Sequence, residues 1–299
     1  MQQIQTIGIA SGLAGNHEAC GLGPIALRDS QYLNTQCKKN GIGLHWLPIL
    51  SANTSLAKHQ AIKQLCLQAE LASSNCIKNK MPFIFFCGEH AYAMGIWKGV
   101  MSALALQKPR AKKLGLIWID AHMDAHTFIS SPSGNVHGMP VAALLGQADD
   151  VLKEIYGDGP ILDAKNLGLL GLRSYEKNES ELLDRLNVMQ ITMERIKHKG
   201  LAYWLTNLRD QVLKHADYFA ISIDIDAIDP KDAPAVGVPE PDGLNGASLC
   251  EALKQFNNDP LLLGLEIAEY SPDFDQKDKT LHLITELVIA IYGKDYGRN

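Results

Sequence analysis

The stretch Leu114-Gly115-Leu116-Ile117-Trp118-Ile119-Asp120-Ala121-His122-Met123-Asp124 joins an apolar run to a set of polar side chains. Residues 114–120 are almost continuously apolar, which is typical of a parallel strand covered on both faces. Acidic and imidazole groups follow directly. In open parallel sheets, ligands bind beyond the carboxyl ends of the strands. The stretch therefore predicts a buried central strand with functional side chains at its carboxyl end.

Similar apolar runs and longer helical patterns alternate along the rest of the chain. We expect further strands over residues 4–10, 83–87, 167–172, 218–224 and 261–267. The helical patterns cover residues 56–76, 91–106, 141–145, 179–186, 246–256 and 280–292. This alternation predicts an α/β fold in which helices flank a parallel sheet on both sides. No repeat, low-complexity linker or break in composition occurs, so we interpret residues 1–299 as a single domain.

The composition is that of a globular protein and excludes several classes of partner. Of 299 residues, 46% are hydrophobic and 20% are charged. The formal net charge of −5 argues against a nucleic-acid binder and against attraction to an anionic membrane. No apolar run approaches the roughly 18 residues that span a bilayer. The first eight residues are polar, which predicts no signal peptide.

The cysteines indicate a reducing compartment. Six of them lie at positions 20, 37, 66, 76, 87 and 250, with no Cys-x-x-Cys pair. This number is too small for a disulfide scaffold in a chain of this length. We therefore expect free thiols, a cytoplasmic protein and no zinc site built from cysteine.

Polar groups also follow three other predicted strands. His90 comes shortly after residues 83–87, Asp224 and Asp226 end the 218–224 run, and Glu269 follows 261–267. Because the carboxyl ends of parallel strands meet at one edge of the sheet, we expect these groups to converge on one crevice.

Four acidic side chains in one crevice would repel one another or take up protons. Two divalent cations would balance them, with two histidines completing the ligands. The predicted metal ligands are His90, Asp120, His122, Asp124, Asp224 and Asp226. Carboxylates and imidazoles without thiolates favour Mn²⁺, Fe²⁺ or Zn²⁺ over copper. Such a pair of cations lowers the pKa of water and generates hydroxide near neutral pH, which predicts a hydrolase.

A single Asp at the end of a strand is usually a cap or turn residue. The joint pattern is different, because alternate residues of an extended chain point to the same side. Asp-x-His-x-Asp at residues 120–124 and Asp-x-Asp at residues 224–226 thus favour a metal site over separate caps.

These motifs resemble the arginase family of ureohydrolases. The resemblance covers residues 120–124, Ser-Gly-Asn-Val-His-Gly-Met-Pro at 133–140 and Ser-Ile-Asp-Ile-Asp-Ala-Ile-Asp-Pro at 222–230. Weaker matches are Gly-Glu-His at 88–90, where the family has Asp for Glu89, Glu-Ile-Ala-Glu-Tyr-Ser-Pro at 266–272 and the segment 21–28. The blocks occur in the family's order and cover most of the chain.

The resemblance implies a three-layer α/β/α sandwich, two Mn²⁺ per subunit and a trimer or hexamer. One Mn²⁺ would be bound by His90, Asp120, Asp124 and Asp224, and the other by His122, Asp120, Asp224 and Asp226. It also implies a small guanidino substrate, and L-arginine, hydrolysed to L-ornithine and urea, is our first choice.

The same resemblance implies roles for further residues. Asp124 would orient the nucleophile, His137 would carry protons to the leaving amine, and Glu269 would face the guanidinium. The expected substrate contacts are His126, Ser133, Asn135, Glu176 and Glu269.

Three residues depart from the arginase pattern. His126 replaces Asn, Glu176 replaces Asp, and Val238 replaces a Thr near the guanidinium. Val238 removes a hydrogen-bonding group, and Glu176 is longer than Asp by one methylene. These changes leave an agmatinase, a guanidino-acid hydrolase and a formiminoglutamase as competing hypotheses. Two hypotheses of a different kind are a single-zinc deacetylase and a non-catalytic protein of the same fold.

Overall fold

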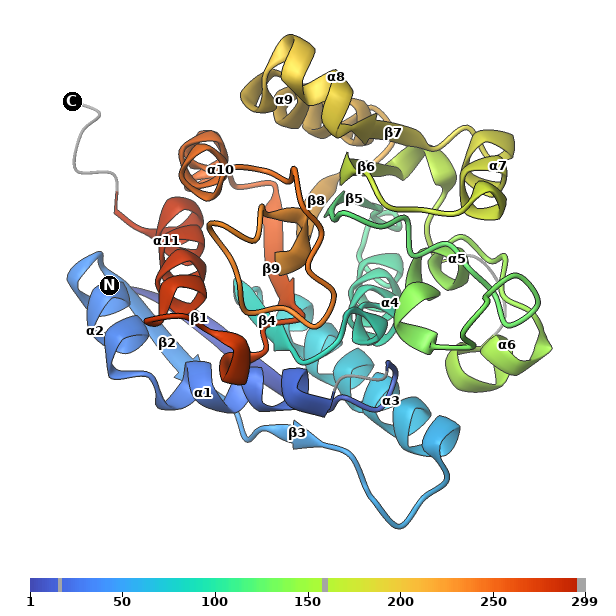
Figure 1. Cartoon of the computed structure of the whole chain (residues 1–299), viewed down its shortest axis with the longest axis horizontal. Helices are drawn as coiled ribbons and strands as arrows, with labels where there is room; N and C mark the ends of the chain where they lie inside the picture. The colour runs from blue at the N-terminus through green and yellow to red at the C-terminus, as the bar shows by residue number, and fades with distance from the viewer. Residues whose placement is uncertain (16–17, 158–160, 295–299) are drawn as a thin grey trace.

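The centre of the structure is a nine-stranded sheet in which every pair of named strands is parallel. The computed structural model describes residues 1–15, 18–157 and 161–294 (Figure 1). The strands are β1 (Gln2–Ala10), β2 (Ile42–Trp46), β3 (Leu50–Ser51), β4 (Phe83–Cys87), β5 (Leu114–Ile119), β6 (Leu167–Leu172), β7 (Met189–Thr192), β8 (Tyr218–Asp224) and β9 (Leu262–Ala268). Their order is β2-β1-β4-β9-β8-β5-β6-β7, and β3 also pairs with β1.

All six predicted strands are present, as β1, β4, β5, β6, β8 and β9. The strands β2, β3 and β7, which lie at or beside the edges of the sheet, were not predicted from the sequence. These strands are short and only partly buried, and β2 includes the exposed residue His45. An edge strand needs no continuous apolar run, so the pattern that identified the central strands was absent there.

Helices cover both faces of the sheet. They are α1 (Gly23–Asp29), α2 (Gln31–Lys39), α3 (Lys58–Lys78), α4 (Ala93–Ala105), α5 (Pro140–Leu144), α6 (Asp150–Tyr156), α7 (Lys177–Arg185), α8 (Met193–Lys199), α9 (Leu201–Leu213), α10 (Gly246–Leu253) and α11 (Lys279–Tyr292). The six predicted helices correspond to α3, α4, α5, α7, α10 and α11, whereas α1, α2, α6, α8 and α9 were not predicted. In the described ranges, no helix is both long and apolar enough to cross a membrane.

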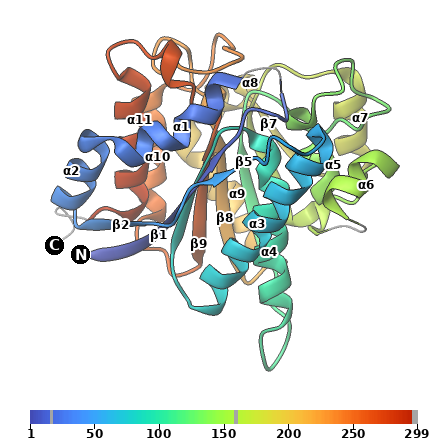
Figure 2. The same cartoon turned by 90° about the horizontal axis from the view of Figure 1, so that it is seen from below.

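Alternate residues of each central strand enter two separate cores. In β4, Phe83 and Phe85 pack with α3 and α4, whereas Ile84 and Phe86 pack on the opposite face. That opposite core includes residues of α2, α9, α10 and α11. Figures 1 and 2 show these groups of helices on opposite sides of the sheet. The predicted three-layer α/β/α sandwich is confirmed.

The strand order brings the four functionally important strand ends together. After β4, the chain skips two places to β5, and β8 and β9 later fill the gap. The neighbours β4, β9, β8 and β5 therefore present their carboxyl ends side by side. We propose that residues 1–299 form one domain, because the sheet takes strands from most of the chain's length.

Close contact between α3 and α4 depends on glycine. A Cβ at Gly99 would overlap the carbonyl oxygen of Glu70, and one at Gly95 would overlap that of Cys66. The backbones of the two helices can approach this closely only because neither position of α4 carries a side chain.

We predict that Gly99→Ala lowers the free energy of unfolding by about 1–3 kcal/mol, because the added methyl group overpacks the helix contact. This loss should exceed the gain of up to about 1 kcal/mol in helix propensity. Urea denaturation followed by circular dichroism measures the change. Ser102→Ala, on the exposed face of α4, is the matched control. Equal stability of the Gly99→Ala variant and the wild type would contradict the packing argument.

Candidate metal centre and active site

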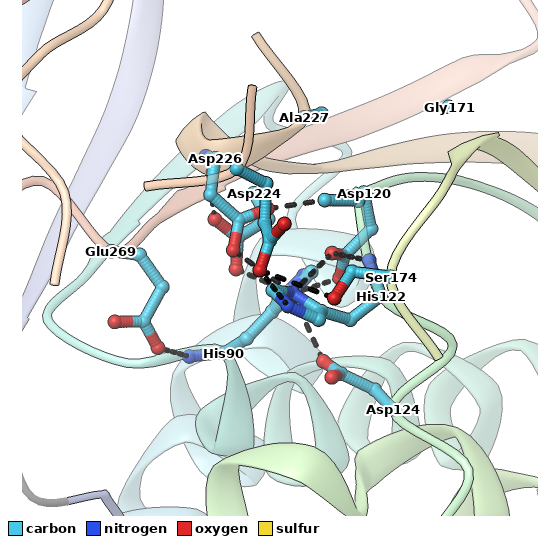
Figure 3. A network of polar contacts seen from close by, with 12 residues as sticks. His90, Asp120, His122, Asp124, Gly171, Ser174, Asp224, Asp226, Ala227 and Glu269 are labelled. Carbon is cyan, nitrogen blue, oxygen red and sulfur yellow. Dashed lines mark hydrogen bonds and ion pairs between the residues drawn. The ribbon is translucent and has the colours of Figure 1, made fainter. Parts of the chain in front are cut away.

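The first group of potential ligands surrounds His90, in the 3-10 turn after β4. Its Nδ1 atom lies 3.1 Å from Asp120 Oδ2, 3.4 Å from Asp124 Oδ2 and 3.3 Å from Asp224 Oδ2 (Figure 3). Asp120 and Asp124 follow β5, and Asp224 ends β8. Three carboxylates from two strands thus converge on a single imidazole nitrogen.

A second group overlaps the first through Asp120. His122 Nδ1 lies 3.0 Å from Asp226 Oδ2 and 3.6 Å from Asp120 Oδ1. Backbone groups also hold these carboxylates, because His122 N–H donates to Asp120 Oδ1 and Asp226 N–H donates to Asp224 Oδ1. The ligand atoms of each overlapping trio lie within 4.8 Å of one another. The trios are His90, Asp120 and Asp224, and Asp120, His122 and Asp226, so they contain five of the six predicted ligands. The sixth, Asp124, lies outside both trios but approaches His90 Nδ1 at 3.4 Å.

The electrostatics of the cluster favour the binding of cations. Asp120, Asp224 and Asp226 are at most 4% exposed, and Asp124 is 7% exposed. Burial and the charge of Asp120 raise the pKa of Asp124 to about 7, and burial and Asp226 raise the pKa of Asp224. Among the described residues, every salt bridge to these four carboxylates comes from His90 or His122. A donor set of carboxylates and imidazoles with excess negative charge suits divalent cations.

Two acidic residues in the site adopt left-handed backbone conformations. The φ angle is +49° at Asp124 and +69° at Glu269. This region costs a residue with a Cβ about 1–3 kcal/mol and is tolerated where the surrounding structure imposes it. At Asp124, the turn brings a side chain beyond the end of β5 back toward His90.

A buried relay fixes the orientation of His90. Its Nε2 atom lies 2.8 Å from Ser222 Oγ, which donates to Glu266 Oε2 at 2.7 Å. Trp97 Nε1–H donates to the same oxygen at 3.1 Å. Burial lowers the pKa of His90, but hydrogen bonds to the three carboxylates outweigh it and raise the pKa, so in the absence of a cation its Nδ1 carries a proton. With Nε2–H donating to Ser222, Nδ1 is the nitrogen that would bind a cation held among the carboxylates.

A cavity of about 160 Å³ opens over the cluster. His137 and Glu269 line it, and Glu269 Oε1 lies 3.8 Å from His137 Nδ1 and accepts the backbone N–H of His90. Burial lowers the pKa of His137, but the contact and charge of Glu269 outweigh it and raise the pKa to about 9. His137 is therefore a cation near pH 7 and can donate a proton into the cavity.

Three residues that depart from the arginase pattern also line the cavity. His126 Nε2 lies 2.9 Å from Glu176 Oε2 and 3.3 Å from Glu179 Oε2. Val238 also lines the cavity. His126, Glu176 and Glu179 could also hold a divalent ion. All three line the same cavity as the main cluster.

Two predicted substrate contacts lie elsewhere. Ser133 and Asn135 are not among the residues lining the cavity. Ser133 is exposed, and its Oγ accepts the backbone N–H of Asn135 at 3.2 Å within the loop. Their contact with substrate stays a prediction.

Several residues around the site were not predicted from the sequence. Glu240 Oε1 lies 3.6 Å from His122 Nε2, and Ser174 Oγ donates to the same Glu240 oxygen. The buried carboxylate of Glu179 accepts the N–H groups of Ala125 and Glu176. The sequence carried a signal for two such residues, because Glu179 falls on an acidic position of the arginase family and Glu266 lies in the motif block 266–272. Nothing in the sequence near Glu240 indicates that it approaches His122.

The fold and this cluster are those of a hydrolase with a candidate metal centre at the carboxyl ends of parallel strands. The sequence model described as "Arginase family" matches residues 2–293. The arginase of Brevibacillus brevis is 27% identical over 301 residues, covering 98% of each protein. The arginase of Bacillus subtilis is 31% identical over 217 residues, covering 73% of this chain and 70% of that protein.

Similarity to solved structures agrees with these matches. The crystal structure of arginase from Bacillus cereus aligns with a TM-score of 0.89 at 25% identity, covering 99% of this chain and 100% of that one. The chain belongs to the arginase family. It is therefore a hydrolase acting on guanidino C–N bonds, in a family whose members depend on metal.

We predict that Ser222→Ala weakens Mn²⁺ binding by about 10- to 100-fold, because the Nε2–H of His90 loses its acceptor and the ring loses its fixed orientation. Equilibrium dialysis with metal analysis measures the affinity. Ser102→Ala is the matched control. Unchanged affinity in the Ser222→Ala variant would show that His90 needs no support from this relay.

We predict that Glu269→Gln lowers the pKa of His137 from about 9, because the carboxylate that stabilises the imidazolium is removed while burial still favours the neutral ring. A larger fraction of the protein molecules would then have a neutral His137 ring at pH 8. NMR titration of ¹⁵N-histidine-labelled protein, freed of paramagnetic metal, measures this pKa. Glu251→Gln, exposed on α10, is the control. A pKa that stays near 9 in the Glu269→Gln variant would assign the shift to another cause.

Proposed function

We propose that this protein hydrolyses L-arginine to L-ornithine and urea with two Mn²⁺ per subunit. The observation that carries the proposal is the pair of overlapping ligand trios sharing Asp120 beneath a cavity lined by Glu269 and His137. Carboxylate oxygens and imidazole nitrogens without thiolates match the preference of Mn²⁺.

The six converging side chains would hold the cations, with Asp120 and Asp224 shared between the two. When bound, such a pair lowers the pKa of water and supplies hydroxide near neutral pH. The negative charge of the cluster, which burial makes costly, is balanced in the same state. Glu89 and Glu269 lie outside both trios.

The chain's own residues would then bind and orient the reactants. The Glu269 carboxylate matches the planar fork of donors on a guanidinium. Asp124 accepts a hydrogen bond from the attacking nucleophile and directs it toward the guanidinium carbon. His137, protonated near neutral pH, donates its proton to the amine that leaves.

The proposed contacts to the amino-acid part of the substrate are His126 and Glu176, which line the cavity, together with Ser133 and Asn135. Two acidic side chains, Glu176 and Glu179, favour a cationic group such as an α-ammonium. Ser133 and Asn135, the residues matched to the α-carboxylate, lie outside the cavity lining. This observation favours agmatine, which lacks the α-carboxylate, as the second candidate substrate.

We also propose that the protein is cytoplasmic and forms a homo-oligomer, either a trimer or a hexamer. The six cysteines form no disulfide within the described ranges and five of them are buried, which supports a reducing compartment. The oligomeric state follows only from the resemblance of the sequence to arginases.

We predict that Asp124→Asn and His122→Ala each reduce urea release from L-arginine by about 10²-fold or more, because each removes a proposed metal ligand and Asp124 also orients the nucleophile. A colorimetric urea assay with added Mn²⁺ measures the loss. The matched controls are Asp150→Asn and His198→Ala, both exposed and outside the cavity lining. Near-wild-type turnover in either variant would end the proposed mechanism.

We predict that the Mn²⁺-loaded protein prefers L-arginine to agmatine, guanidino acids and formiminoglutamate. A panel of these substrates, with urea and ammonia measured separately, checks the preference through kcat/KM. A large preference for agmatine would replace L-arginine as the substrate. Ammonia without urea would identify a formimino substrate.

A further inference from the structure

The loop that follows β1 is fastened to the residue that precedes His90. The Glu89 carboxylate, only 1% exposed, accepts the backbone N–H of Ala14 at 2.6 Å through Oε2. Its other oxygen, Oε1, accepts the backbone N–H of Gly15. Two consecutive N–H groups of one segment thus point at one buried carboxylate from another.

The same loop holds the turn that contains His137. The carbonyl oxygen of Ala14 accepts the backbone N–H of Val136 at 2.8 Å and that of His137 at 3.4 Å. These groups begin the 3-10 turn Val136–Gly138, whose N-cap residue, Asn135, makes no side-chain capping bond. The Ala14 peptide therefore connects Glu89 on one side with the backbone of His137 on the other.

The loop also passes close to the imidazole ring, leaving little room for a side chain at Gly15. A Cβ placed on Gly15 would lie 3.3 Å from His137 Nδ1 and 3.0 Å from Glu89 Oε1. Glu269 Oε1 approaches the same nitrogen at 3.8 Å. The backbone of the loop and the Glu269 carboxylate thus both lie beside His137 Nδ1.

The length of Glu89 and its two acceptor oxygens satisfy this geometry. Both N–H groups need an acceptor, and a carboxylate offers two, whereas an amide offers one oxygen and one NH₂ group. Aspartate is shorter by about 1.5 Å, so it cannot reach both groups without movement of the loop. Glu89 does not line the cavity, so it does not contact substrate directly.

We propose that Glu89 is a positioning residue for His137, acting through the Ala14–Gly15 backbone. It follows β4 directly, beside the proposed metal ligand His90. Two consecutive residues after β4 therefore act on the site: His90 is a proposed cation ligand, and Glu89 positions the proton-donating imidazole of His137. The catalytic role of His137 in this inference rests on the proposed function. The hydrogen-bonded connection from Glu89 through Ala14 to the His137 backbone does not.

The kinetic test compares Glu89→Gln and Glu89→Asp with the wild type, each loaded with Mn²⁺ and assayed for urea. A displaced imidazole slows proton delivery without weakening guanidinium binding. We expect kcat to fall by roughly 10- to 100-fold in the Glu89→Gln variant while KM and bound manganese stay within about threefold. Gly15→Ala, which crowds the same contact from the loop side, should give the same pattern. Glu251→Gln, exposed on α10, is the control and should match the wild type.

A double-mutant cycle identifies the residue through which Glu89 acts. In a His137→Asn background, Glu89→Gln should have almost no further effect on kcat, because the group that it positions is already gone. Equal losses of kcat in both backgrounds would overturn the proposal. Loss of bound manganese as the main effect would also overturn it, because Glu89 would then act through His90.

Hydrogen exchange separates this inference from the proposed function. In the Mn²⁺-loaded protein, Glu89→Gln should speed amide exchange at Ala14 and at residues 136–137, measured by mass spectrometry of short peptides. This result would support the connection even if no guanidino substrate were hydrolysed, which would instead remove the proposed function. Wild-type exchange at both segments would overturn the connection. If Glu89→Gln fails to fold, Glu89→Asp and Gly15→Ala test the same exchange.

Discussion

Repulsion among four carboxylates buried at one edge of the sheet is the constraint on which this structure depends. Asp120, Asp224 and Asp226 are almost inaccessible to solvent, and their salt bridges in the described ranges come only from histidine. Desolvation makes such charge costly unless protons or cations compensate it. Cations bound by the candidate ligands would both stabilise this region and supply its chemistry.

The backbone geometry of the scaffold holds these groups in place. Insertion of β8 and β9 between β4 and β5 places four strand ends in adjacent positions. At two of those ends, Asp124 and Glu269 take left-handed conformations that redirect their side chains. Strain of this kind persists where rigid surroundings impose it, and the packed cores on both faces of the sheet provide those surroundings.

The residues that line the cavity differ in how closely they match arginases. The candidate metal ligands match the family's motif blocks, and they lie at strand ends that the sheet positions rigidly. The substituted positions His126, Glu176 and Val238 lie on loops. His126 is held between two glutamates, so any substrate with an ammonium tail must compete with an imidazole for those carboxylates.

The sequence alone determined the central strands, a parallel sheet flanked by helices and the convergence of the six candidate ligands, because burial on both faces and alternate side-chain direction are local properties of a strand. Only the tertiary structure decided the edge strands, the approach of Glu240 to His122 and the position of Ser133 outside the cavity lining. It alone also revealed the fastening of Ala14 by Glu89. Pairs such as His122 with Glu240 and Ala14 with Glu89 lie far apart in the sequence. Such contacts depend on loop paths and on which side chains meet across the sheet edge, and no local pattern of residues encodes either.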